Sequence, residues 1–326
     1  MKAIVNTAAG RVQWLDCPMP EPGPGQVRIR TAACGVCATD LLMIAGWQRT
    51  GFPAIPGHEW SGTVDSAAPE ADRALLGRRC VAENVLADGG EVGFEHSGGY
   101  AQYFLTEAKN VHPLPDEFPP AVAALIEPLA VCVHSLRRLR LEDRGSALVL
   151  GDGPIGLLML LLLKAEKVQC LALVGGRPAR LALARDLAGC AVLNYHEAGP
   201  ELLQAVMALR GAPFPTLVEA SGSATAMNLA MDLAPHGGKI VVMGDYGEHR
   251  ADFPWNQLLH REVELIGSNA SAGAWPQAVE LAVAGVLPLE RLVSCRLPAQ
   301  AFAEALEMAR RSRDVVKVVM EWPKGK

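Results

Sequence analysis

Four side chains in the sequence have the chemistry of metal ligands. Cys37 lies in CGVCATD, His58 and Glu59 follow about twenty residues later in PGHEWSG, and Glu127 lies much further on in LIEPLAV. Thiolate, imidazole and carboxylate are the groups that a catalytic zinc ion uses while one position stays open for substrate. Cys37, His58 and Glu127 therefore predict one catalytic zinc site, and Glu59 is a fourth candidate. A second carboxylate could bind or release the ion as substrate enters.

A second group of residues has the chemistry of a dinucleotide site. Gly151, Gly153 and Gly156 form G-x-G-x-x-G, which includes Pro154 and Ile155 and follows the apolar run SALVL. Such glycines permit a tight turn, let the backbone approach a pyrophosphate and pack a helix against a strand, with the phosphates at the helix N-terminus. A helical pattern follows, and a second apolar run ends about twenty residues on. This context indicates that the five residues bind a dinucleotide cofactor.

The end of the second apolar run bears on which dinucleotide is bound. Gly175 and Gly176 stand where an NAD enzyme usually has Asp or Glu for the ribose hydroxyls. Gly175 leaves room for a 2′-phosphate, and Arg177 and Arg180 could hold it by charge-assisted hydrogen bonds. Alternatively, both arginines are solvated at the start of a surface helix. We predict that NADP is preferred to NAD.

The elements that must position these groups follow two patterns, which together predict an α/β protein. The first third has short β-type runs broken by Gly and Pro, and they predict a compact β domain: 26–31, 62–65, 79–83 and 99–106. From Ser146, strand-like and helix-like segments alternate, which predicts a parallel sheet covered on both faces. A helix from Pro119 connects the two parts. We expect one domain at 1–118 with 290–326, and the other at 119–289.

Composition and charge narrow the class of protein. Of the 326 residues, 50% are hydrophobic and 20% charged, which allows a large core and two domains. The formal net charge is −5 without a basic tract, so we expect no nucleic-acid or membrane partner. The apolar run Leu157–Leu163 is too short for a membrane span, and no signal-peptide pattern opens the sequence. We therefore expect a cytoplasmic protein, and its 8 scattered cysteines do not form a disulfide framework.

Taken together, the motifs resemble the zinc-dependent medium-chain alcohol dehydrogenases, and more closely their threonine- and polyol-dehydrogenase-like members. The matching pieces follow the family order over nearly the whole chain: CGVCATD, GHEWSG, GGYAQY, IEPLAV, LGDGPIGLL, EASGS, GGKIVVMG and LIGSNA. The resemblance implies a Rossmann doubly wound parallel sheet plus a GroES-like β-rich catalytic domain. It also implies that Cys37 and His58 bind the zinc, with Glu127 or Glu59 as the remaining protein ligand.

The same resemblance assigns further roles. Thr39 matches the hydroxyl that contacts the substrate oxygen, and Asp40 matches an acid that orients the histidine. A carboxylate on the distal imidazole nitrogen fixes the tautomer and strengthens the ligand, although Asp40 could instead form a local turn or cap. Ser221 in EASGS and Gly244 in GGKIVVMG fall among the cofactor-binding positions.

Two departures from the family pattern stand out. Relatives commonly carry four closely spaced cysteines for a structural zinc, but the stretch from Cys80 to Gly98 contains no further cysteine. We therefore expect no structural zinc, because tetrahedral closure needs ligands that this shortened lobe lacks. Leu42 stands where many relatives have a histidine that passes a proton towards solvent. The proton must then leave through water, the cofactor ribose or another group.

The expected activity is that of an NAD(P)-dependent alcohol or polyol dehydrogenase, in which zinc acts as a Lewis acid and Thr39 passes the proton. One alternative is a zinc-free quinone or enone reductase of the same fold, and another is a non-catalytic NADP-binding protein. The metal-site residues count against both. We expect a small alcohol or carbonyl substrate, and a homodimer or higher homo-oligomer through the edge strand Val263–Ser268. Five aromatic residues could line the substrate site or belong to the core: Trp47, Phe52, Trp60, Phe94 and Tyr100.

Overall fold

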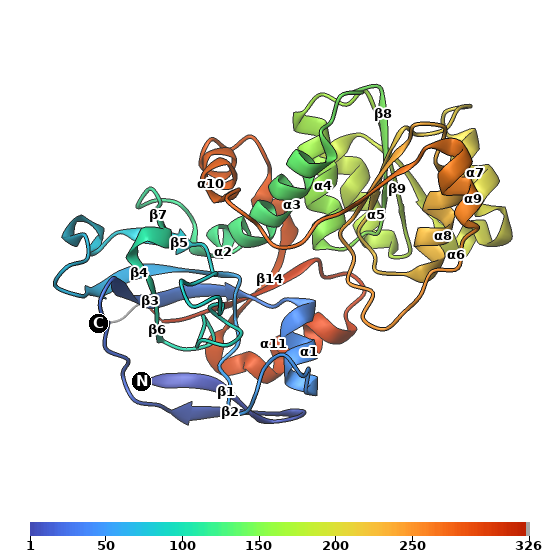
Figure 1. Cartoon of the computed structure of the whole chain (residues 1–326). Coiled ribbons are helices and arrows are strands. Elements are labelled where there is room, and N and C mark those ends of the chain that lie inside the picture. The colour runs from blue at the N-terminus through green and yellow to red at the C-terminus, as the bar shows by residue number, and fades with distance from the viewer. Residues whose placement is uncertain (324–326) are drawn as a thin grey trace. The chain divides into compact units, whose positions relative to one another are not determined.

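The computed structural model describes residues 1–323 and divides into two compact units (Figure 1). Unit 1 combines Met1–Glu127 with the segment from Trp275 onward, and unit 2 is Pro128–Ala274. The sequence predicts boundaries at 118/119 and 289/290, whereas the units divide at 127/128 and 274/275. Unit 1 is larger than expected because α2 (Pro120–Ala123) and α10 (Trp275–Val283) pack against its strands. We propose that the two functional domains follow these units.

Unit 1 is built on a seven-stranded sheet and a two-stranded sheet. In order, the larger sheet contains β14 (Val293–Pro298), β15 (Lys317–Glu321), β3 (Gln26–Gly35), β4 (Trp60–Ala67), β5 (Arg79–Ala82) and β7 (Val111–Pro113), with β6 (Tyr103–Glu107) also paired to β3. The hairpin of β1 (Lys2–Ala8) and β2 (Arg11–Asp16) forms the smaller sheet. Each of the four predicted strand runs overlaps an observed strand, and the C-terminal strands β14 and β15 belong to this unit.

The sequence of β3 explains its place at the centre of unit 1. Successive side chains of a strand point to opposite faces, and Val27 and Ile29 accordingly lie in the core while Arg28 and Arg30 are partly exposed. The alternation stops at Cys34 and Gly35, which are both buried. The C-terminal end of β3 is therefore enclosed on both sides. Two helices of this unit were not predicted, α1 (Ala38–Ala45) and α11 (Phe302–Arg311).

Unit 2 contains the predicted parallel sheet. Its six strands are all parallel and run in the order β10 (Ala191–Asn194), β9 (Cys170–Gly175), β8 (Ser146–Leu150), β11 (Thr216–Glu219), β12 (Lys239–Val242) and β13 (Glu264–Gly267). The helices of the unit are α3 (Ile126–Leu139, from the end of unit 1), α4 (Pro154–Ala165), α5 (Pro178–Ala188), α6 (Tyr195–Ala198), α7 (Leu202–Ala208), α8 (Ala224–Leu233) and α9 (Trp255–Arg261). Figure 1 shows α4 on one side of β8 and β9, and α7 and α8 on the other.

Burial on both faces explains the composition of these elements. Every residue of β8 is buried, as are all residues of α4 from Gly156 to Leu163. Continuous apolar runs are typical of parallel strands with helices on both sides. The helix predicted from Pro119 is in fact interrupted between α2 and α3, and α9 was not predicted.

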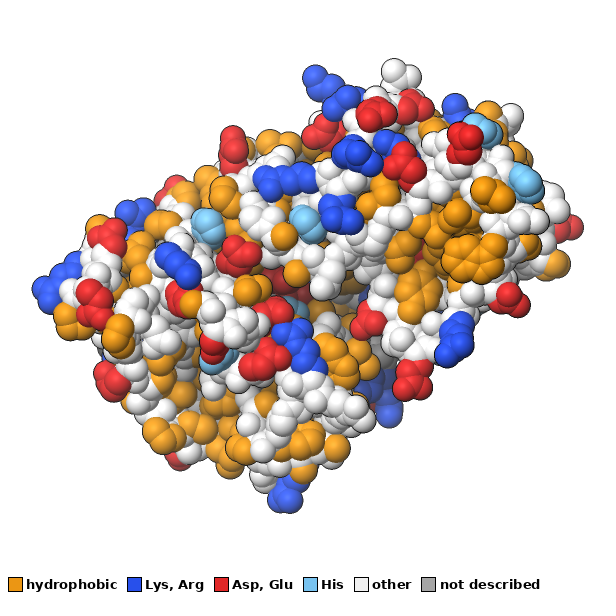
Figure 2. All heavy atoms as spheres, viewed as in Figure 1, with side chains coloured by type: hydrophobic (Ala, Val, Ile, Leu, Met, Phe, Trp, Pro, Cys, Tyr) orange, Lys and Arg blue, Asp and Glu red, His pale blue; other side chains and the backbone are white. Residues whose placement is uncertain are grey.

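One helical stretch, Pro120–Leu139, is long and apolar enough to cross a membrane by length and composition, with a mean hydropathy of 1.3. In the folded chain, 67% of an apolar 18-residue part of this stretch is buried inside the protein, as in a core helix. On the face shown in Figure 2, acidic and basic side chains are intermingled rather than gathered into areas of one sign. Neither feature singles out a membrane as a partner.

Candidate active site

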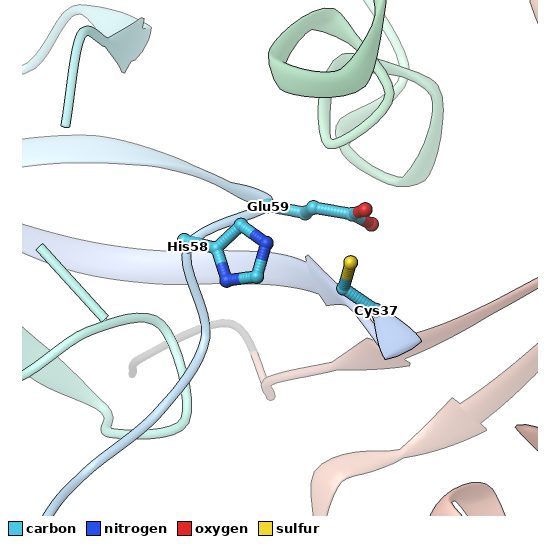
Figure 3. A group of neighbouring side chains, drawn as sticks. All are labelled: Cys37, His58 and Glu59. Atoms are coloured by element: carbon cyan, nitrogen blue, oxygen red, sulfur yellow. The ribbon is translucent and has the colours of Figure 1, made fainter. Parts of the chain in front are cut away.

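Three of the four predicted metal ligands lie together in unit 1. One ligand atom each of Cys37, His58 and Glu59 lies within 4.8 Å of the others. Figure 3 shows a ring nitrogen of His58 directed towards the Glu59 carboxylate and the Cys37 thiol. The sheet creates this proximity, because Cys34 of β3 pairs with Trp60 of β4 in antiparallel register. The residues just after one strand therefore lie beside those just before the other.

Asp40 holds two members of this cluster. Its Oδ1 lies 3.3 Å from Nδ1 of His58, and its Oδ2 accepts hydrogen bonds from the backbone nitrogen of Cys37 at 2.8 Å and the Tyr100 hydroxyl at 3.2 Å. Burial alone would lower the pKa of His58, but the negative charges of Asp40 and Cys37 raise that pKa well above its ordinary value. Asp40 is fully buried. Its carboxylate caps helix α1 through the Cys37 backbone nitrogen and also faces Nδ1 of the imidazole.

Glu59 has a buried partner that the sequence reasoning missed. Nζ of Lys317, in β15, lies 2.6 Å from each carboxylate oxygen of Glu59, and both side chains are nearly inaccessible to solvent. Burial alone would lower the pKa of Lys317, yet the charge of Glu59 raises it. A Cβ on Gly35 would lie 2.3 Å from the Glu59 carboxylate, so glycine is needed there. The available signal was a lysine inside the apolar run VVKVVM, since a buried lysine needs a counter-charge.

Glu127 lies outside the three-residue cluster but responds to the same charges. The pKa of Glu127 is raised to about 7, chiefly by burial and also by the charge of Glu59, although His58 and Lys317 act to lower it. The carboxyl group is therefore partly protonated near neutral pH when no cation is bound. A nearby cation would favour its charged form.

Thr39 lies beside the cluster, in the first turn of α1. The thiol of Cys37 donates a hydrogen bond to the Thr39 hydroxyl, with 3.6 Å between sulfur and oxygen. Leu42 lies on the same helix and is 46% exposed, so an aliphatic side chain faces outward there. The hydroxyl of Thr39 is thus a group beside Cys37 that can exchange a proton.

The shortened lobe packs directly on the histidine. A Cβ on Gly93 would lie 2.6 Å from the backbone nitrogen of His58, and the Phe94 ring lies 4.7 Å from the imidazole. The guanidinium carbon of Arg49 lies 4.4 Å from the centre of the Phe94 ring. The same guanidinium group forms ion pairs with Glu91 and Glu95, each at 2.7 Å. These contacts fix one wall beside His58.

The other aromatic candidates have different environments. The Tyr100 hydroxyl donates a hydrogen bond to the Asp40 carboxylate. Trp60 is a core residue: its ring packs on Phe104, and its indole nitrogen donates a hydrogen bond to Asn84. Trp47 and Phe52 are exposed at the surface.

The glycine motif of unit 2 has the expected local geometry. Gly151 has a φ of +121°, and a Cβ on Gly156 would lie 2.0 Å from the carbonyl oxygen of Gly151. At Gly153, the N-cap of α4, an added Cβ would meet no atom within 4 Å. Pro154 and Ile155 form the first turn of that helix. The motif therefore combines a tight turn, close helix packing and an open backbone at the helix N-terminus.

The predicted phosphate-binding residues after β9 surround an acid. Nη1 of Arg177 lies 2.7 Å from Oδ1 of Asp152, and Nη1 of Arg180 donates to the Asp152 carbonyl oxygen at 3.4 Å. Arg177 is partly exposed, but Arg180 is only 8% exposed, so the two are not both solvated surface arginines. A Cβ on Gly175 would lie 2.6 Å from Cβ and Oδ2 of Asp152. The room that Gly175 leaves is therefore filled by Asp152, a residue that the sequence reasoning did not single out.

Ser221 and Gly244 follow the ends of β11 and β12, and parallel pairing brings them to the same sheet edge as Gly151 and Gly175. Ligands of open α/β sheets bind at this carboxyl edge. Glu219, also missed, ends β11 and accepts hydrogen bonds from the backbone nitrogen of Ser221 at 2.8 Å and the Tyr246 hydroxyl at 2.7 Å. The sequence feature that could have identified Glu219 is an acid at the end of an apolar strand, in LVEAS.

Comparisons with known proteins agree with both parts of this arrangement. Residues 23–116 match the family model of the alcohol dehydrogenase GroES-like domain, and residues 154–284 match that of the zinc-binding dehydrogenases. The chain is 30% identical to an L-threonine 3-dehydrogenase of Mesorhizobium japonicum over 99% of both proteins. It is 26% identical to a D-arabitol-phosphate dehydrogenase of Enterococcus avium, over 98% of this chain and 97% of that protein. The galactitol-1-phosphate dehydrogenase of Escherichia coli superposes with a TM-score of 0.87 at 26% identity, covering 98% of this chain and 100% of that one.

The buried ion pair leads to a stability prediction. Lys317→Met should lower the free energy of unfolding by about 3–5 kcal/mol, because it leaves the Glu59 carboxylate buried without its counter-charge. Urea unfolding followed by tryptophan fluorescence measures this change. Lys2→Met removes an exposed pair with Asp16 and should have little effect. Equal stabilities of the two variants would contradict the importance given to the buried pair.

Proposed function

Because the chain belongs to the medium-chain dehydrogenases of the alcohol dehydrogenase superfamily, we propose that unit 1 holds a catalytic zinc ion through Cys37, His58 and a glutamate carboxylate. The enzyme is an NAD(P)-dependent oxidoreductase that acts on the hydroxyl group of an alcohol or polyol. The observation that carries the zinc proposal is the cluster of thiol, imidazole and carboxylate within 4.8 Å. Asp40 supports it, because this acid faces Nδ1 and leaves the other ring nitrogen for the cluster.

The donor set fits zinc in type and charge, and a bound zinc ion would supply Lewis-acid polarisation of the substrate oxygen. The Asp40 carboxylate faces the imidazole and, through the Cys37 backbone nitrogen, holds the start of α1. Thr39 would take the substrate proton at Oγ1, because its hydroxyl lies next to Cys37. Leu42 carries no titratable group, so the proton would pass from Thr39 to water, the cofactor ribose or another group. Phe94 would limit access of water to His58, since its ring packs on the imidazole.

Either Glu59 or Glu127 completes the proposed ligand set. Glu59 is the closer of the two to Cys37 and His58, but Lys317 binds both of its oxygens. Glu127 lies outside the cluster and has a pKa near 7, which a cation would lower. Zinc affinities of Glu59→Gln and Glu127→Gln distinguish them, because loss of a direct ligand weakens binding more than loss of a nearby charge.

For the cofactor, we propose NADP in preference to NAD. Arg177 and Arg180, which follow β9, support this choice. The proposed contacts of the cofactor are Gly151, Gly153, Pro154, Ile155, Gly156, Gly175, Arg177, Arg180, Ser221 and Gly244. We also propose a cytoplasmic location and a small-molecule substrate, with no nucleic-acid or membrane partner, since the chain has a net charge of −5 without a basic tract.

The zinc proposal predicts about one zinc ion per chain, because a single adequate ligand set is visible in residues 1–323. Cys37→Ala should abolish zinc binding and alcohol oxidation but leave nucleotide binding intact, since the glycine motif lies in the other unit. Elemental analysis, NADPH-linked turnover of an alcohol panel and nucleotide titration measure the three properties. Two zinc ions per chain, or NADPH oxidation by zinc-free protein with an enone in place of the alcohols, would contradict the proposal. A protein that binds nucleotide but turns over none of the alcohols would favour a non-catalytic role.

The cofactor proposal predicts that Arg177→Ala weakens NADPH binding by about 1.5–3 kcal/mol and leaves NADH binding nearly unchanged. Arg177 is the N-cap of α5, whereas the exposed Arg185 lies in the last turn of the same helix. Arg185→Ala is therefore a matched control that should affect neither nucleotide. Calorimetric titration provides the affinities. A wild-type enzyme that binds NADH more tightly than NADPH would refute the NADP preference.

For the assembly, we propose a homodimer formed through the segment Val263–Ser268. β13 is the last strand of the parallel sheet and pairs only with β12 in the described structure. An unprotected edge strand tends to pair with another chain. We expect light scattering at micromolar concentration to give the mass of a dimer, and a monomer over that range would count against this interface.

A further inference from the structure

We propose that Asp152, inside the glycine motif, sets how strongly the enzyme discriminates between NADP and NAD. The inference rests on the proposed placement of the cofactor at the glycine motif and deepens it by identifying a specificity-determining acid. Asp152 lies between Gly151 and Gly153, directly after β8, and is only 3% exposed. It therefore stands between the pyrophosphate end of the motif and the strand end that receives the adenosine ribose.

The hydrogen bonds of Asp152 tie the two halves of the nucleotide site together. Its Oδ2 accepts from the backbone nitrogens of Gly176 at 2.9 Å and Arg177 at 2.8 Å, and its Oδ1 accepts from Nη1 of Arg177 at 2.7 Å. Three donors therefore give both oxygens of this buried carboxylate a hydrogen-bond partner. These bonds fix the turn after β9 and the direction of the Arg177 side chain at the same time.

Gly175 and Asp152 form a complementary pair. The strand end lacks an acid in the sequence, but a side chain at Gly175 would start 2.6 Å from Cβ and Oδ2 of Asp152. The glycine loop thus delivers a carboxylate to the place where an NAD enzyme usually carries one on the strand. For the same reason, Gly175→Asp would first displace Asp152, so that substitution is a poor way to change cofactor preference.

The charge balance determines the direction of the effect. Arg177 attracts a 2′-phosphate, but the ion pair with Asp152 offsets much of its positive charge. A phosphate that contacted Arg177 would also lie close to the negative carboxylate. The 2′-hydroxyl of NAD is neutral and suffers no such repulsion. Asp152 therefore weakens NADP binding relative to NAD binding and keeps the preference for NADP modest.

Asp152→Asn separates these contributions. An asparagine can turn its carbonyl oxygen to the backbone nitrogens of Gly176 and Arg177, so the turn keeps its acceptor. It loses the negative charge and releases the Arg177 guanidinium. We expect the ratio of the dissociation constants of NADH and NADPH to rise by at least about tenfold, chiefly through tighter NADPH binding.

A matched control comes from the opposite edge of the sheet. Asp143 precedes β8 and also accepts a backbone hydrogen bond, from the nitrogen of Gly145 at 2.6 Å. Asp143→Asn removes the same charge at the amino end of the strand and should leave the ratio unchanged. Any shift seen only in Asp152→Asn is then a local effect at the nucleotide end.

The experiment titrates full-length wild type, Asp152→Asn and Asp143→Asn with NADPH and NADH and follows the cofactor fluorescence. The expected result is a rise of the ratio in Asp152→Asn alone. An unchanged ratio, a shift towards NADH or an equal loss of both nucleotides would overturn the inference, because Asp152 would then act only as a structural support. A wild type that prefers NADH would refute the proposed NADP preference, but the shift in Asp152→Asn would still decide the role of the acid.

Discussion

The buried ion pair between Glu59 and Lys317 connects the parts of unit 1 on which the site depends. Lys317 comes from the C-terminal strand β15, and Glu59 directly precedes β4. The two lie together because β3 pairs with both strands, and the backbone nitrogen of Gly35 donates to the Glu59 carbonyl oxygen at 2.7 Å. A carboxylate buried as deeply as that of Glu59 would be costly without a cation. The lysine thus allows Cys37 and Glu59 to remain close when no metal is bound.

A buried aspartate has a similar structural role in each of the two sites. Asp40 accepts a backbone hydrogen bond from Cys37 and faces the ring of His58, and Asp152 accepts backbone hydrogen bonds from Gly176 and Arg177 and holds the Arg177 guanidinium. Each carboxylate is buried, so its interactions are stronger than they would be in water. Each therefore fixes a local turn and the direction of one charged or titratable side chain together.

Local sequence patterns were sufficient for much of the fold. The alternation in β3, the apolar strands of unit 2 and the glycines at 151 and 156 each depend on neighbours within one segment. The proximity of Cys37 and His58 followed from their family motifs and is explained by the β3–β4 pairing. The role of Lys317 was not predicted, because its partner Glu59 is distant in the chain and no sequence periodicity encodes that pairing. Helix α1 was not predicted because its 8 residues, ATDLLMIA, form only about two turns, which is too short for a helical period to stand out.

The two glycines that matter most to the sites were harder to interpret, because a glycine records a close approach without identifying what approaches. At Gly35 the neighbour is the carboxylate of Glu59, and at Gly175 it is the side chain of Asp152. The sequence suggested that Gly175 made room for a phosphate of the cofactor. The structure shows instead that the protein's own acid occupies that room. A glycine at a strand end is therefore evidence about cofactor charge only after the side chains of the neighbouring strand have been placed, since a carboxylate delivered from there opposes the attraction of a 2′-phosphate.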